Sequence, residues 1–396
     1  MRILFVVESC LRINTSANLC HLAYIQGAID NGCQVDVISV SEQPGAIDNS
    51  ILLPKGVNWI FVNPPKYSQS FFTTTGEGNR DIRNNQKKKK CLNLKELIKS
   101  SVKRIYGLYG RTPTLWVKEA SKYRSNDKYN YIISLATPFI SHRLGMLLIK
   151  KKHIKAEKFI EIWEDPWSLS LFNRVHNAKI EREEKKLISF ADTVVYVTPL
   201  TLKYQQEYFP EYSKKMKWLP LPYYYKNATR QRNYGEEYLF GYYGDYFSFS
   251  RNLKPFYEAA KETRINTNIF GNTDESFEST DKILVKPRVD LKTLTEAENK
   301  TTVYVFLCNL KGGQIPGKIY QNSATYKQIL FILDGTEEEK RILRNYFEQF
   351  NRYEFCDNNV ESIKEGIRRI VEGDSKAVCE PVEEFSPKKI FEEILK

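Results

Sequence analysis

The sequence predicts an α/β protein made of two doubly wound domains that face each other across a cleft. Short apolar runs typical of buried parallel strands alternate with stretches of helical periodicity, first over residues 1–215 and again from residue 238 to the end. A Pro- and Tyr-rich stretch, Leu219–Tyr225, and the polar Lys226–Glu237 separate the two series and have the composition of a linker. A chain of 396 residues is also longer than one core normally organises.

We therefore expect an N-terminal Rossmann-like domain over residues 1–222 and a C-terminal domain over residues 223–380. Residues 64–125 interrupt the first domain as a basic, amphipathic insertion. Ser386-Pro387 is a cap and first-turn pair that predicts a last helix, and we expect residues 381–396 to pack back on the N-terminal domain.

The N-terminal series begins with an apolar strand, a polar turn and a helix that stops at Asn31-Gly32. No GxGxxG follows the first strand, so the dinucleotide fingerprint is absent. The expected strands are 1–7, 34–40, 57–62, 129–135, 158–162 and 193–198, and the expected helices are 16–31, 92–123, 138–152, 175–190 and 199–208.

The C-terminal series repeats the alternation. Its expected strands are 238–243, 267–270, 282–285, 302–308, 328–333 and 352–355, and its expected helices are 251–264, 291–299, 316–327, 337–350, 361–372 and 387–396.

Composition narrows the class of protein. With 41% hydrophobic and 27% charged residues the chain is globular, and no apolar run approaches the roughly 20 residues that span a bilayer. The first strand meets Glu8 too early for a signal peptide. Seven scattered cysteines without a CxxC pair argue against a zinc site or a disulfide framework and fit a reduced, cytoplasmic setting.

The charge is concentrated in one segment. Between Arg83 and Arg124, 13 Lys and Arg side chains meet only two acids, whereas the net charge of the whole chain is +12. A basic amphipathic helix with Trp116 at its edge favours an anionic lipid surface, which predicts a peripheral protein on the inner face of the cytoplasmic membrane. The alternative is a helix that packs on its own domain with solvated lysines. No nucleic-acid motif accompanies the charge, so we expect no nucleic-acid partner.

The stretch Gln314–Gln321 follows an apolar strand and opens a predicted helix, which is a position that suits an anion. Pro316 fits a first helical turn, Gly313 and Gly317 let backbone approach a ligand, and Lys318 adds a full positive charge. The stretch is either a diphosphate cradle or an ordinary loop with a solvated lysine.

Four segments of the second half carry a family resemblance: Gly241–Asp245, Arg251–Pro255, Ile269–Gly271 and Gln314–Leu330. Together they resemble the nucleotide-sugar half of GT-B-fold glycosyltransferases, most closely the bacterial group-1, family-4-like type that assembles capsule, exopolysaccharide and O-antigen. The resemblance covers most of residues 130–375 by order of elements. It is sharp only around 241–255 and 312–333.

The resemblance implies that the C-terminal domain binds a nucleoside diphosphate sugar as donor substrate, with no other cofactor and no metal. Lys318 and Arg251 would neutralise the diphosphate and stabilise the charge of the leaving group. The full set of donor-binding residues expected on this basis is Lys318, Arg251, Gly244, Gly313, Gln314, Gly317, Tyr320 and Gln321.

The sequence departs from the family at two positions. Retaining members often carry two glutamates eight positions apart, and these positions fall here on Gly313 and Gln321. Neither residue can act as a carboxylate, which leaves the stereochemical outcome open and keeps a non-catalytic relative among the alternatives. Gln321 retains the capacity to hydrogen-bond ribose hydroxyls.

An inverting transfer needs a general base for the acceptor hydroxyl. Asp165 is the candidate, because it lies in the segment Glu161–Ser168 at the end of a predicted strand. The tripeptide Asp165-Pro166-Trp167 also resembles a sequence that such transferases carry at this place. Glu164 and Glu161 are neighbours that would raise the pKa of Asp165. The alternative is that Asp165 only caps the turn before Pro166.

The acceptor side is expected to include Glu8 and Trp167. Trp163 and Trp167 either stack on sugars or belong to the core, and we expect core for one of them. His21 and His142 are less favoured bases, since isolated histidines near helices are usually structural.

These observations predict a metal-independent glycosyltransferase that acts on a lipid-linked or polysaccharide acceptor. The alternatives are a nucleotide-sugar epimerase of the same architecture and a non-catalytic subunit that binds sugar nucleotides.

Overall fold

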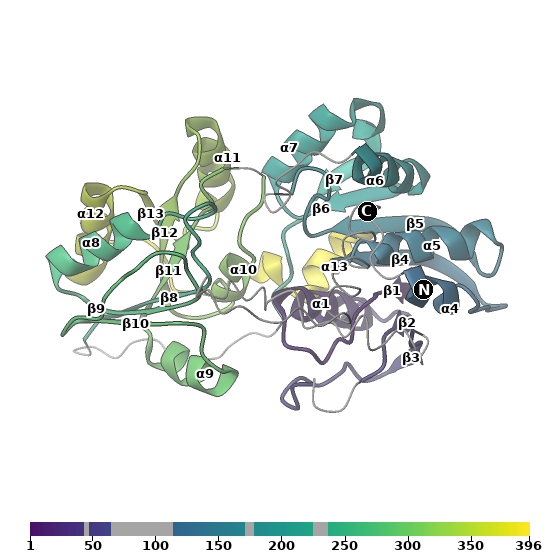
Figure 1. Ribbon diagram of the computed structural model, residues 1–396, viewed down its shortest axis with the longest axis horizontal. Helices are drawn as coiled ribbons and strands as arrows, with labels where there is room; N and C mark the ends of the chain where they lie inside the picture. Colours follow the sequence, from purple (N-terminus) through teal and green to yellow (C-terminus); the bar gives the residue numbers. More distant parts are fainter. Residues whose placement is uncertain (43–46, 65–113, 171–177, 225–236, 312) are drawn as a thin grey trace, which may run out of the picture. The chain divides into compact units, whose positions relative to one another are not determined.

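The computed structural model describes residues 1–42, 47–64, 114–170, 178–224, 237–311 and 313–396 (Figure 1). The chain divides into two compact units. Unit 1 comprises Met1–Val197, Gln205–Leu219 and Phe391–Lys396, and unit 2 comprises Thr198–Tyr204 and Pro220–Ile390.

Unit 1 is built on a seven-stranded sheet in the order β3-β2-β1-β4-β5-β6-β7, and every neighbouring pair is parallel. The order reverses between β1 and β4, which makes this point the switch point of a doubly wound sheet. The strands are β1 (Arg2–Val6), β2 (Gln34–Ser39), β3 (Val57–Phe61), β4 (Lys128–Ala136), β5 (Lys155–Trp163), β6 (Thr193–Tyr196) and β7 (Met216–Trp218).

Local sequence explains where the first helix of unit 1 begins and ends. Thr15 caps α1 by accepting a hydrogen bond from the backbone N–H of Asn18, and Gly32 follows the helix with φ +72°. The helices of this part of the chain are α1 (Ser16–Asp30), α4 (Thr114–Ala120), α5 (Ile140–Lys150), α6 (Ala178–Phe190), α7 (Pro199–Tyr208), the short 3₁₀ turn η1 (Pro210–Lys215) and α13 (Pro387–Leu395).

The end of the chain belongs to the core of unit 1. Phe391 of α13 is fully buried and its ring lies 6.3 Å from the ring of Phe5 on β1. Lys217 of β7 donates to the last carbonyls of α13, at Glu393 and Ile394, where the helix dipole favours a cation.

Unit 2 is built on a six-stranded parallel sheet in the order β10-β9-β8-β11-β12-β13. Its switch point lies between β8 and β11. The strands are β8 (Leu239–Tyr243), β9 (Asn266–Phe270), β10 (Ile283–Lys286), β11 (Val303–Leu307), β12 (Gln328–Leu333) and β13 (Glu354–Asp357).

Helices cover both faces of this sheet, because right-handed crossovers on the two sides of a switch point lie on opposite faces. Helices α8 and α12 pack side by side on one face (Figure 1). The elements are α8 (Lys254–Thr263), α9 (Leu291–Lys300), α10 (Lys318–Asn322), α11 (Glu337–Glu348), α12 (Val360–Glu372) and the 3₁₀ turn η2 (Glu383–Phe385).

The predicted fold class, two doubly wound α/β domains, is confirmed by these two parallel sheets. One strand was not predicted. The three residues of β7 carry no apolar run that would identify them in the sequence, and pairing with β6 makes them a strand.

The sequence predicted that Trp116 lies at the edge of a lipid-facing surface, and this prediction is wrong. Its side chain is fully buried, and its indole N–H donates to the carbonyl of Val62 at 3.0 Å. The lysine run Lys87–Lys90, residues 92–113 of the basic helix expected over 92–123, and most of the linker 226–237 lie outside the described residues.

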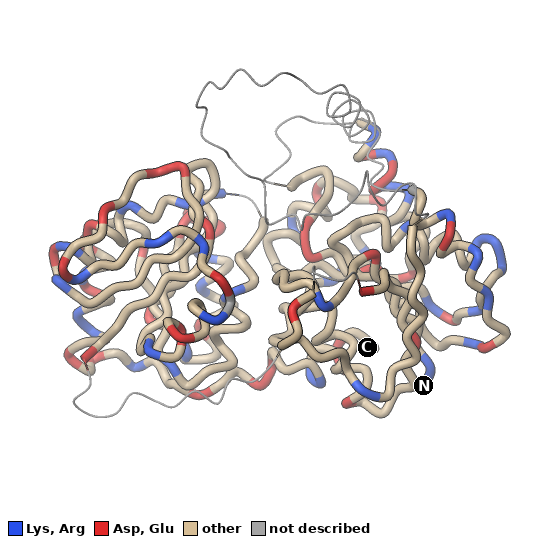
Figure 2. Tube along the Cα trace, turned by 60° about the horizontal axis from the view of Figure 1, so that its bottom comes forward, with Lys and Arg blue, Asp and Glu red and all other residues tan. Residues whose placement is uncertain are grey.

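Along the described parts of both units, basic and acidic residues are interspersed on the trace (Figure 2). Among the described residues, no helix is long and apolar enough to cross a membrane.

Candidate functional site

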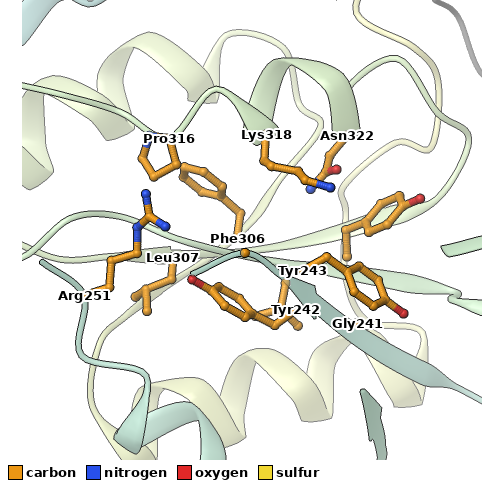
Figure 3. A pocket seen from close by; sticks show the side chains of 12 residues that line it. Gly241, Tyr242, Tyr243, Arg251, Phe306, Leu307, Pro316, Lys318 and Asn322 are labelled. Carbon is orange, nitrogen blue, oxygen red and sulfur yellow. The ribbon is translucent and has the colours of Figure 1, made fainter. Parts of the chain in front are cut away.

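A pocket lies at the switch point of unit 2, beside β8 and β11, and Figure 3 shows side chains that line it. Open α/β sheets bind ligands at this place, outside the carboxyl ends of their strands. Its wall combines backbone and aromatic rings of the two strands with two cationic side chains. The lining residues are Gly241, Tyr242, Tyr243, Gly244, Arg251, Tyr304, Val305, Phe306, Leu307, Pro316, Lys318 and Asn322.

Arg251 is held in a fixed orientation at this pocket. Its Nε donates to Oδ1 of Asn309 at 2.9 Å, and its Nη1 donates to the carbonyl of Asp245 at 2.6 Å. Asn309 is in turn fixed through its amide, which donates to the carbonyl of Gln314 at 2.8 Å. The guanidinium is therefore preorganised before any ligand binds, which lowers the entropic cost of binding an anion.

Lys318 is the second cation at the pocket and the first residue of α10 (Figure 3). Its Nζ lies 2.9 Å from Oε1 of Glu298, and 38% of its side chain is exposed. Within the described part of the chain, the ammonium pairs with Glu298 alone, and it stays accessible to an anion in solution.

The helix that begins at Lys318 is much shorter than the predicted 316–327, with only five residues. Two hydroxyls explain the difference, because they hydrogen-bond to backbone carbonyls and compete with helix continuation: Ser323 Oγ donates to Ile319 O, and Thr325 Oγ1 donates to Asn322 O. A single helical turn supplies little dipole, so the positive charge at this pocket comes from Lys318 and Arg251.

The three glycines expected to bind the donor, Gly244, Gly313 and Gly317, differ in what a side chain at their position would meet. A Cβ on Gly244 would meet nothing closer than 3.8 Å, so the backbone there is open. A Cβ on Gly313 would lie 2.8 Å from the backbone nitrogen of Thr201, and one on Gly317 would lie 3.1 Å from Leu221. Backbone packing within unit 2 therefore accounts for glycine at position 313, whereas at position 317 a small shift of the Leu221 side chain would make room for a Cβ.

Unit 1 also gathers polar groups at the carboxyl edge of its sheet. After β1, the backbone N–H of Glu8 donates to Ser141 Oγ at 2.9 Å. After β5, Oε1 of Glu164 lies 3.3 Å from Nε2 of His21 on α1. Burial raises the pKa of Glu164, the nearby His21 opposes the rise, and the like charge of Asp165 adds to it.

The aromatic residues beside these acids have distinct positions. Trp163 is fully buried, with the tilted ring of His142 at 4.3 Å and the stacked ring of Phe139 at 5.4 Å, so it is the tryptophan that belongs to the core. Trp167 is partly exposed, and its ring stacks on that of Phe139 with the two ring centres 4.9 Å apart. A buried His142 bonded to Ser134, with a pKa far below its usual range because of burial, is a structural residue.

Comparison with solved structures shows the same architecture over the full chain. TarM matches with a TM-score of 0.58 at 9% identity, covering 100% of this chain and 98% of that chain. The sucrose-phosphate synthase of Thermosynechococcus elongatus matches with a TM-score of 0.54 at 10% identity, covering 98% and 94%. The lipopolysaccharide outer core galactosyltransferase WaaB matches with a TM-score of 0.52 at 11% identity, covering 100% and 98%.

These neighbours are GT-B glycosyltransferases. The chain has the GT-B fold. No family model matches the sequence, and no curated protein sequence does.

Two residues that the GT-B resemblance assigned to the donor serve the packing of unit 2. Tyr320 is 1% exposed and its ring meets Phe385 edge-on at 5.0 Å, so it is part of the core. Oε1 of Gln321 accepts the backbone N–H of Tyr224 at 3.1 Å. Sequence alone could not separate them from Lys318, because positions two and three residues apart on a short helix point in different directions.

Glu184, which was not among the residues predicted from the sequence, anchors the loop that follows β5. This buried carboxylate on α6 accepts the backbone N–H groups of Trp167 at 3.2 Å and of Ser168 at 2.7 Å. Gln205 donates to it as well, at 3.4 Å. A signal was present: Glu184 lies three and four positions before Leu187 and Ile188, on the buried face of a highly charged helix.

Glu161, expected beside Asp165, faces a different set of groups. It is fully buried, accepts the indole N–H of Trp163 at 3.1 Å, and lies within electrostatic range of Glu184 and Lys215. Burial raises the pKa of Glu161 to about 8. Glu164, which pairs with His21, is close enough to Asp165 for the two like charges to interact.

Proposed function

We propose that this protein is a glycosyltransferase that moves a sugar from a nucleoside diphosphate donor to an acceptor hydroxyl without the help of a metal ion. The observation that carries the proposal is the pair Arg251 and Lys318 at the switch-point pocket of unit 2. A diphosphate leaving group gains negative charge as its bond to the sugar breaks, and fixed cations stabilise that charge.

In the proposed reaction the acceptor oxygen forms a bond to the anomeric carbon while the bond from that carbon to the diphosphate oxygen breaks. The hydroxyl proton passes to Asp165, supported by its neighbour Glu164. Arg251 is suited to meet the leaving diphosphate because Asn309 and Asp245 already fix its guanidinium. Lys318 is suited to follow the developing charge because it is held by one exchangeable ion pair.

Glu8 and the partly exposed Trp167 are proposed for the acceptor side, since both follow strands of the unit 1 sheet at its carboxyl edge. We propose a lipid-linked or polysaccharide acceptor in cell-surface polysaccharide synthesis, with the basic segment 83–124 binding the anionic inner face of the cytoplasmic membrane.

The experiment is isothermal titration of UDP, GDP and ADP into the purified protein, followed by product analysis with the matching nucleotide sugars. Binding of one diphosphate by the wild type, lost in Lys318→Ala and in Arg251→Ala while both variants unfold at the wild-type temperature, supports the proposal. Lys311→Ala is the control, since it removes an exposed cation that does not line the pocket. Undiminished binding in both pocket variants would overturn it.

A non-catalytic role as a sugar-nucleotide-binding subunit is the second candidate. It is favoured by Gly313 and Gln321, which stand where retaining relatives carry glutamates, and by the engagement of Gln321 with the backbone of Tyr224. Binding without transfer to any member of a broad acceptor panel would support this candidate. A change of the donor sugar in the absence of acceptor would instead identify an epimerase.

A further inference from the structure

We propose that Glu298 is an internal competitor of the diphosphate: its carboxylate pairs with Lys318 when the pocket is empty and releases that ammonium when a diphosphate binds. This inference rests on the proposed function, because it concerns the same pocket.

The geometry of the pair allows an exchange of partners. Glu298 lies on α9 and Lys318 lies on α10, and the two charged atoms are 2.9 Å apart. Their side chains are 21% and 38% exposed, so water reaches both. Ion pairs with this degree of exposure are weak, and a doubly charged phosphate chain next to Arg251 can replace one carboxylate at the ammonium.

Helix physics gives no other reason for an acid at this position. Glu298 stands in the last turn of α9, at the negative end of the helix dipole, where a carboxylate is locally unfavourable. The end of the helix is already capped by Lys327, whose ammonium donates to the backbone carbonyls of Glu298 and Asn299. The carboxylate of Glu298 is therefore not needed to stabilise α9. Its ion pair with Lys318 offsets the unfavourable interaction with the helix dipole.

A second cation remains near Glu298 once Lys318 turns to a ligand. Burial lowers the pKa of Lys327 to about 8, and the negative charge of Glu298 opposes this decrease, which shows that the two charges interact. The carboxylate keeps a favourable neighbour after the exchange, so release of Lys318 does not leave an uncompensated charge behind.

The exchange predicts that removing the charge of Glu298 strengthens diphosphate binding. An exposed ion pair of this type corresponds to an affinity gain of about two- to fivefold when it no longer has to be broken. The gain must act through Lys318, so it disappears when Lys318 is absent. It also shrinks at high salt, because salt already weakens the competing pair.

The test is titration of UDP, GDP and ADP into the wild type, Glu298→Gln, Lys318→Ala and the double variant, at 20 and 300 mM NaCl. Glu296→Gln is the matched control, since it removes the same charge from an exposed position of the same helix. Thermal unfolding of each variant verifies that it is folded.

Tighter diphosphate binding in Glu298→Gln, with the Glu296→Gln control unchanged and no binding regained when Glu298→Gln is added to Lys318→Ala, supports the inference. Equal or weaker binding in Glu298→Gln overturns it, and a weaker value would make Glu298 a residue that positions Lys318. If the wild type binds none of the diphosphates, the proposed function fails. The inference then fails too unless Glu298→Gln gains binding.

Discussion

Nε2 of His21 lies 3.3 Å from Oε1 of Glu164, and the imidazole is fully buried while the carboxylate is almost so. The pair joins α1 to the loop after β5 and fixes the residue next to Asp165 in the sequence. Glu164 thus has an internal partner in His21, and its negative charge acts on Asp165, the residue that we propose as the base for the acceptor hydroxyl.

This assignment predicts separate effects on turnover and on donor binding. Asp165→Asn should lower kcat at least about 100-fold, the usual loss when a general base is removed. The affinity for the nucleoside diphosphate should change less than about twofold, because Arg251 and Lys318 are unaffected. Initial rates and calorimetry on one preparation measure both quantities. Full turnover in the variant would assign the base elsewhere.

A second prediction concerns pH and Glu161. Its native pKa of about 8 lies above its ordinary value of 4.5, because of burial. Between these values the native protein keeps the proton that the unfolded chain releases, so this residue makes the free energy of unfolding fall as pH rises from about 4.5 to about 8. The fall is expected to reach up to about 5 kcal/mol.

Glu161→Gln removes this dependence and keeps an oxygen that can accept the indole N–H of Trp163. Urea unfolding should give similar stabilities for wild type and variant at pH 5, and a more stable variant at pH 8.5. Glu157→Gln on the same strand is the control, since that carboxylate is exposed and its pKa is lowered by Lys128. A difference between Glu161→Gln and wild type that does not vary with pH would contradict the prediction.

The glycines at two neighbouring strand ends of unit 2 should respond differently to alanine. A Cβ on Gly271 would lie 1.9 Å from the carbonyl oxygen of Gly244, so Gly271→Ala forces backbone apart and should cost about 3 kcal/mol of unfolding free energy. A Cβ on Gly244 meets nothing within 3.8 Å and should leave stability unchanged. Since Gly244 lines the pocket, its variant should weaken diphosphate binding instead. Equal stability losses would refute this distinction.

A further prediction separates membrane binding from folding. Replacing Lys87–Lys90 by glutamine should reduce sedimentation with vesicles that contain phosphatidylglycerol, with little change with neutral vesicles, because each basic residue near an anionic surface adds about 1 kcal/mol.

Trp116→Phe is the complementary variant. It removes a buried indole that donates to Val62, so it should lower stability by about 1–2 kcal/mol and leave vesicle binding intact. Loss of vesicle binding in Trp116→Phe, or its persistence in the lysine variant, would place the membrane contact elsewhere.

The sequence by itself determined the two doubly wound domains, because buried parallel strands and amphipathic helices leave a local pattern that survives without tertiary information. It also determined that Arg251 and Lys318 each come after a strand, since each follows its own apolar run at a short distance.

Only the tertiary structure decided which neighbours of Lys318 reach the pocket and which serve the core. Tyr320 stands two residues from Lys318, yet it joins an aromatic cluster with Phe385, which is distant in the sequence. The same holds for Glu298 and Glu184, whose partners lie on other elements. Helical periodicity places a residue on one face of its own helix. The groups that this face contacts belong to segments distant in the sequence, and no local pattern encodes which segments these are.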